Sequence, residues 1–63
     1  MKIEYFRQDH EWEWEFSVTK GARTRVVARS PQTYASAGSA VRGAKSFLNN
    51  VKGGGRVKVT RRV

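Results

Sequence analysis

Apolar and polar residues alternate along the first thirty positions of the chain in a pattern that predicts three β-strands. The clearest run, 11–18, has an apolar residue at every second position: Trp12, Trp14, Phe16 and Val18. A period of two is typical of a strand with one buried face and one solvent-exposed face. Residues 2–8 and 23–30 are also rich in β-forming residues and predict a first and a third strand.

Short turns connect these three strands. Asp9 and His10 mark the first turn, and 19–22 form the second, where Gly21 can adopt a positive φ without steric cost. Pro31 cannot donate a hydrogen bond to a neighbouring strand, so it ends the third strand and begins a connection. The three strands are therefore predicted to form an antiparallel meander.

The spacing of apolar residues then changes to that of an amphipathic helix. Ser36 is the predicted N-cap, and the helix should run to about Val51. Seven apolar residues fall within about a third of a helical wheel: Ala37, Ala40, Val41, Ala44, Phe47, Leu48 and Val51. We expect this stripe to cover the aromatic face of the second strand and to bury both indoles. Gly38 and Gly43 each cost the helix about 1 kcal/mol relative to alanine, which indicates close backbone approach.

Three consecutive glycines, 53–55, stop the helix and predict a flexible joint, 52–56, before a basic last strand, 56–63. In that strand valines alternate with basic residues. A lone strand must pair with a sheet edge, either of its own chain or of a second chain. The predicted class is α+β, as one two-layer domain over 1–63: a three-stranded meander, one helix and a C-terminal strand (β3αβ).

The small size of the chain predicts self-association. A 63-residue domain buries only about 60% of the surface that its unfolded chain exposes, so its stability is marginal. The chain has no cysteine for a disulfide, and one histidine, His10, cannot supply a closed zinc site. Self-association is therefore the expected source of additional stability, and we expect no cofactor. Because no apolar run is long enough for a membrane span or a signal peptide, we expect a cytoplasmic protein.

Charge is distributed very unevenly along the chain. The formal net charge is +8, and all five acidic residues lie in the first fifteen positions, which sum to −3. Residues 16–63 carry +11 with no acidic residue. A strong positive field concentrates polyanions near the surface, so nucleic acid or an acidic protein is the expected class of partner.

The order of these elements resembles that of the YegP-like family of small bacterial and archaeal proteins of unknown function. The resemblance covers about 3–52 and rests on an aromatic strand, a glycine turn, a short strand ending in Ser30, and Tyr34 and Ser36 before a helix of small residues. Pro31, and Lys-Gly-Ala-Arg at the second turn, depart from the family pattern. The resemblance implies β3αβ units that associate in pairs, either as tandem repeats or as two subunits, by exchanging C-terminal strands. Because this chain holds one unit, the resemblance implies a homodimer with exchanged strands, and it implies no activity, cofactor or binding residue.

Basic residues on the helix flank and in the last strand form the predicted polyanion site: Arg42, Lys45, Lys52, Arg56, Lys58, Arg61 and Arg62. Such a band can contact phosphates without reading bases. The alternative is a protein-interaction module that captures an acidic partner through the same surface. Insertion of the sheet into a DNA groove is disfavoured, because the outward residues of the second strand are glutamates.

No arrangement of residues predicts catalysis. An enzyme needs a poised acid, base or nucleophile in a concave site, and only His10 and Asp9 lie together, in a turn. The glutamates of the second strand are expected to form cross-strand ion pairs with Arg23, Arg25 or Arg29. Trp12 and Trp14 offer a stacking surface for unpaired bases, but their alternation with Phe16 and Val18 favours the core.

Overall fold

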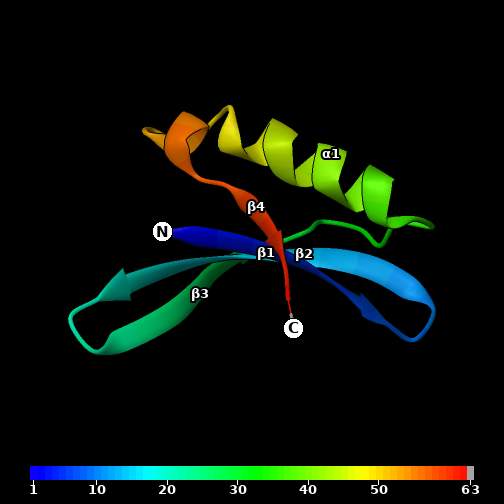
Figure 1. Ribbon diagram of the computed structural model, residues 1–63, viewed down its shortest axis with the longest axis horizontal. Coiled ribbons are helices and arrows are strands. Elements are labelled where there is room, and N and C mark those ends of the chain that lie inside the picture. Colours follow the sequence, from blue (N-terminus) through cyan, green and yellow to red (C-terminus); the bar gives the residue numbers. More distant parts are fainter. Residues whose placement is uncertain (63) are drawn as a thin grey trace.

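The computed structural model describes residues 1–62 as one helix packed on a four-stranded sheet (Figure 1). The elements follow the predicted order: β1 Lys2–Gln8, β2 Glu11–Lys20, β3 Arg23–Arg29, α1 Ala37–Leu48, the 3₁₀ turn η1 Gly54–Arg56 and β4 Val59–Arg61. The α+β class and the antiparallel meander are confirmed.

Both predicted hairpin turns are present. Asp9 and His10 connect β1 to β2 with φ of 51° and 69°, the pair of positive φ values that a two-residue type I′ turn requires. At the second turn Gly21 takes a φ of 62°. β2 continues to Lys20, two residues beyond the predicted end, so the β2–β3 hairpin is longer than expected.

Helix α1 begins where the sequence predicted and ends earlier. The backbone N–H of Ser39 donates to the Ser36 hydroxyl at 3.3 Å, which confirms the N-cap. The helix stops at Leu48, because Asn50 and Val51 bond to carbonyls three residues back, at 3.0 and 3.1 Å. The last predicted turn is thus a tightened 3₁₀-like turn, a common helix ending.

The glycine segment is a compact turn, which differs from the flexible joint that was predicted. Gly53 adopts a φ of 78°, and the N–H of Gly54 bonds to the Val51 carbonyl at 2.8 Å. The N–H of Val57 then bonds to the Gly54 carbonyl at 3.0 Å. These bonds close η1 and delay the last strand, which starts at Val59 and not at Arg56.

Strand β4 completes the sheet of its own chain. It lies parallel to β1, with Ile3 opposite Val59 and Tyr5 opposite Arg61, and the strand order is β3-β2-β1-β4. The sheet is therefore mixed, and β1 is a central strand. Val63, the last residue of the predicted strand, lies outside the described residues.

One layer of side chains between α1 and the sheet forms the core. Its buried apolar members are Ile3, Trp14, Phe16, Ala40, Ala44 and Leu48. Phe47 packs on the sheet aromatics, with its ring centroid 4.8 Å from that of Trp14. Gly43 faces Tyr34 so closely that a β-carbon there would lie 2.3 Å from the phenol oxygen. The close approach expected of the two helix glycines is confirmed at Gly43, whereas Gly38 has nothing within 4 Å.

The prediction that both indoles are buried is wrong for Trp12. Trp14 is 2% exposed, whereas Trp12 is half-buried and does not pack against the core cluster. The backbone of Trp12 pairs with Tyr34, just before α1 begins. The helix opens with small residues, Ala37 and Gly38, whose short side chains reach less far over this end of the sheet.

The other face of the sheet is not covered by a helix (Figure 1). Residues that alternate with the core positions point there, including Glu4 and Glu15, which lie directly opposite each other on β1 and β2. β3 forms one outer edge of the sheet, and six of its seven residues are exposed. Val26 and Val27 on this edge are 39% and 47% exposed.

Candidate nucleic-acid interface

The helix presents two predicted basic residues to solvent. Ala40 and Ala44 are fully buried against the sheet, whereas Arg42 and Lys45 lie on the outer side of the helix and are exposed. Arg42 also donates to the Ser39 hydroxyl at 3.3 Å, which holds its side chain along the first turns of α1.

The turn after the helix brings the last segment of the chain beside Lys45. A shallow hollow of about 250 Å³ is lined by Lys45, Leu48, Asn49, Gly54, Gly55 and Val57. Lys52 and Arg56 are exposed on either side of the glycines in this same turn. The helix flank and the last segment therefore lie side by side, and this contact is formed within one chain.

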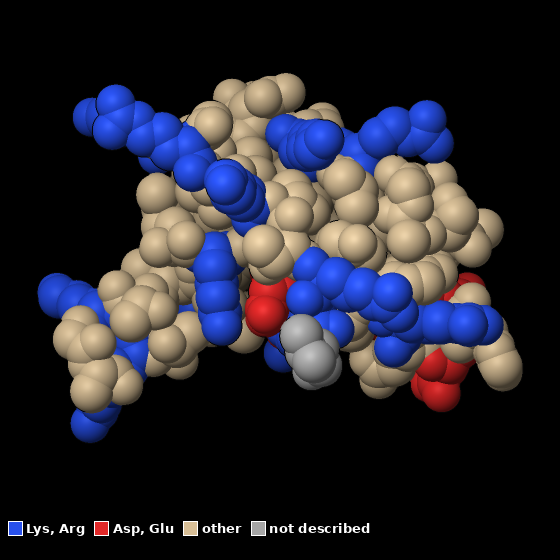
Figure 2. All heavy atoms as spheres, in the orientation of Figure 1, with Lys and Arg blue, Asp and Glu red and all other residues tan. Residues whose placement is uncertain are grey.

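Exposed basic residues continue into β4. Lys58 precedes the strand, and Arg61 lies in it with its guanidinium carbon 5.5 Å from the centroid of the Trp12 ring. Figure 2 shows Lys and Arg side chains over the helix, the β4 edge and the β2–β3 hairpin, with acidic side chains visible only in small areas. We call six of these residues the basic band: Arg42, Lys45, Lys52, Arg56, Lys58 and Arg61.

Arg62, the seventh predicted residue, is engaged elsewhere. Its Nη2 donates to Oε1 of Glu15 at 2.6 Å, and its Nε donates to Oε1 of Glu4 at 3.3 Å. Its guanidinium carbon also lies 4.2 Å from the centre of the Phe6 ring. The hydrogen bond to Glu15, with the charges of both glutamates, raises the pKa of Arg62 although partial burial lowers it. We therefore leave Arg62 out of the basic band.

Arg62 neutralises two glutamates that lie opposite each other in the sheet, so replacing it should lower the stability of the fold. Like charges directly opposite each other destabilise a strand pair, and Arg62 bridges Glu4 and Glu15, which form such a pair. Arg62→Gln should lower the free energy of unfolding by about 1 kcal/mol. Urea denaturation followed by circular dichroism measures this change. Lys58→Gln is the control, and equal midpoints for the two variants would contradict the bridge.

The cross-strand ion pairs were predicted correctly at one position. Nε of Arg29 lies 3.3 Å from Oε2 of Glu15, and these residues are opposite each other in the register. Glu11 and Glu13 lie beyond the end of β3, and no ion pair joins them to another residue within 1–62. Arg23 and Arg25 stand opposite Lys20 and Val18 instead.

The β2–β3 hairpin carries basic residues that the sequence analysis did not include in the site. A broad concavity of about 780 Å³ is lined by Val18, Lys20, Arg23, Thr24, Arg25 and Val27. It lies near the β3 edge, whereas the basic band follows α1 and the β4 edge. The longer β2 creates this hollow, and its length could not be read from the alternation alone.

Side chains with catalytic or metal-binding chemistry are sparse in the part of the chain that the structure describes. His10 is exposed in the first turn, with Nδ1 3.4 Å from Nη2 of Arg7. Within residues 1–62 no three His, Cys, Asp or Glu side chains are grouped to hold a metal ion. No helix in this range has the length and apolar character needed to cross a membrane.

The chain was compared with protein-family models, with curated proteins and with solved structures, and none of the three comparisons found a match. The resemblance to the YegP-like family stays a prediction. Fold and surface chemistry are thus the basis on which function is inferred.

Proposed function

We propose that this chain is a small, non-enzymatic binding protein that holds nucleic acid through its phosphate backbone, without sequence preference. The observation that supports this proposal is the basic band, six exposed Lys and Arg side chains that follow α1, the glycine turn and β4. Phosphate contacts need only positive charge and reach, whereas sequence reading needs side chains that enter a groove.

The position of the acidic residues supports approach of a polyanion from the side of the band. Glu13 and Glu15 belong to the uncovered face of the sheet, because they alternate with buried Trp14 and Phe16. Glu4 and Glu15 are further neutralised by Arg62 and Arg29. A phosphate backbone laid along α1 and β4 thus avoids most of the negative charge.

The salt dependence of binding tests the proposal. If all six band residues contact phosphates, the logarithm of the association constant should fall with the logarithm of salt with a slope of about −5 for duplex DNA. A triple variant, Arg42→Ala, Lys45→Ala and Lys52→Ala, should reduce the magnitude of that slope by about 3. Fluorescence anisotropy of a labelled duplex across a salt series gives both slopes.

A matched control tests whether binding depends on the position of the basic band or only on the net charge of the protein. Replacing Lys20, Arg23 and Arg25 with alanine removes the same number of charges from the β2–β3 hairpin. This control should bind with the slope of the unmodified protein. Equal slopes for both triple variants would contradict the band as the interface, and no binding to any oligonucleotide at low salt would contradict the proposed function.

Capture of an acidic protein is the alternative use of the same surface. Poly-glutamate offers similar charge without phosphates, so it serves as the competing probe. Displacement of nucleic acid by a small excess of poly-glutamate would favour the alternative. Displacement only at a large excess would favour nucleic acid.

We also propose that two chains associate by exchanging β4. The small core and the three-residue pairing of β4 with β1 support this, since exchange repeats the same contacts between chains. Light scattering at micromolar concentration should then give twice the 7.2 kDa mass of one chain, and a single-chain mass with the fold intact would contradict it.

A further inference from the structure

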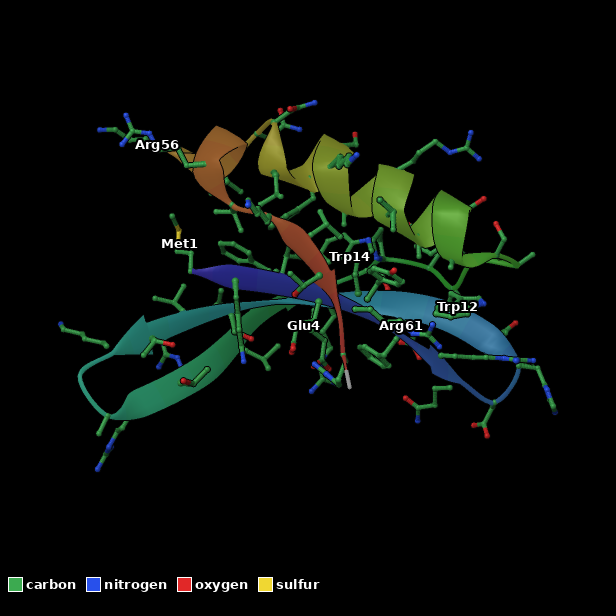
Figure 3. The ribbon with its side chains drawn as sticks, in the orientation of Figure 1. Met1, Glu4, Trp12, Trp14, Arg56 and Arg61 are labelled. Carbon is green, nitrogen blue, oxygen red and sulfur yellow. The ribbon has the colours of Figure 1, made fainter. Side chains whose placement is uncertain are left out.

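Trp12 belongs to a small aromatic cluster at the edge of the core, because its neighbour Tyr5 packs against the core cluster. Its ring centroid lies 5.9 Å from that of Tyr5, with the planes tilted by 42°, and the guanidinium of Arg61 lies over it. Both rings are only half-buried. Figure 3 places Trp14 between α1 and the sheet, and Trp12 with Arg61 toward the Asp9–His10 end.

The hydrogen bonds by which Trp12 holds the neighbouring connection are made by its backbone, and its indole packs on Tyr5 at the edge of the core. Trp12 holds the 30–35 connection through its backbone, which exchanges two hydrogen bonds of 2.8 Å with the backbone of Tyr34. A smaller apolar side chain leaves both bonds in place. Since its ring packs against no member of the core cluster, the chemistry of the ring itself calls for another explanation.

Aromatic rings beside basic residues are the usual means by which proteins bind single-stranded nucleic acid. A base stacks on the ring while basic side chains follow the backbone, and the stacking is tolerant of sequence. The aromatic ring and the basic residues are adjacent in this protein, because Arg61 belongs to the basic band and also lies over Trp12.

We infer that Tyr5, Trp12 and Arg61 form a stacking platform for an unpaired base, so that the protein prefers single-stranded to duplex nucleic acid. This inference rests on the proposed function and adds the class of nucleic acid to it. A base bound on Trp12 leaves its phosphate within reach of Arg61, and the strand then continues along the basic band.

The geometry allows a base to enter between the indole and the guanidinium. The guanidinium carbon lies 5.5 Å from the centroid of the indole, so a base enters between them only if the Arg61 side chain moves outward. Arg61 is exposed, and it lies in a short edge strand. Its side chain can therefore move to the far side of a base that stacks on the indole.

The test compares a single-stranded oligonucleotide of about 15 thymidines with a duplex of equal length at low salt. The unmodified protein should bind the single strand more tightly. Trp12→Leu should lose about tenfold or more of that affinity, and its affinity for the duplex should stay unchanged. Phe6→Leu is the matched control, because Phe6 also carries an arginine over its ring, on the other face of the sheet, and it should leave both affinities unchanged.

Intrinsic fluorescence gives a second readout that needs no variant. Trp14 is buried, so Trp12 should account for quenching of emission when the single strand binds, and the duplex should quench little. Equal affinity of the two nucleic acids, with Trp12→Leu and the unmodified protein alike, would overturn the platform and leave the proposed function standing. Absence of binding to both would overturn the proposed function as well.

Discussion

Replacing Gly54 with alanine is expected to remove about half of the stability of this fold. A β-carbon at Gly54 would lie 2.2 Å from the carbonyl oxygen of Leu48, 3.0 Å from its carbonyl carbon and 3.1 Å from Cβ of Val51. The obstacle is mainly backbone at the end of α1, so no change of rotamer relieves it. Overpacking of this kind costs about 1–3 kcal/mol and occasionally more, and a core of this size supplies about 3–5 kcal/mol.

Gly55→Ala is the control for this prediction. A β-carbon there meets nothing within 4 Å, and Gly55 has no positive φ. Alanine should therefore be neutral or should stabilise by about 0.4–1 kcal/mol, since it restricts the unfolded chain. Thermal and urea unfolding compare the two variants, and similar midpoints would contradict the compact glycine turn.

Gly43→Ala and Gly38→Ala should change stability in opposite directions. At Gly43 the new carbon would lie 2.3 Å from the Tyr34 hydroxyl oxygen and 2.7 Å from its Cζ. The ring cannot withdraw freely, because its hydroxyl accepts from Nε1 of buried Trp14 at 3.4 Å and its backbone is bonded to Trp12. The overlap, about 1–3 kcal/mol, should exceed the gain of about 1 kcal/mol in helix propensity.

At Gly38 an added β-carbon makes no clash, so the gain in helix propensity is not offset. Nothing lies within 4 Å of the position that the new carbon would take, so Gly38→Ala should stabilise the protein by about 0.5–1 kcal/mol. Urea midpoints of the two variants should fall on either side of the midpoint of the unmodified protein. A stabilising Gly43→Ala would show that Tyr34 does not pack where the structure has it.

The elements of this fold were predictable because their patterns are local. Alternation over 11–18 identified β2, and Ser36 identified the start of α1. Alternation also says which face of a strand is apolar, but not how far a covering helix extends over it. Trp12 and Trp14 share a face and a residue type, and only the first lies outside the core.

Local position was enough to predict which basic residues of the helix are exposed, but not which basic residue of the last strand is paired. Exposure of Arg42 and Lys45 follows from their positions on one helix. Arg62 has its partners on β1 and β2 only because β4 lies parallel to β1 in one particular register. Nothing near Arg62 in the sequence identifies Glu4 or Glu15 as its neighbours.

The charge on the outer strand β3 bears on how the protein behaves at high concentration. Its free edge exposes Val26 and Val27, apolar residues of the kind that let sheets of separate molecules join and aggregate. Arg25 and Arg29 flank this pair in the sequence, with Arg23 close by. Two copies that met along this edge would bring their arginines together, and the repulsion discourages growth of a shared, fibre-like sheet.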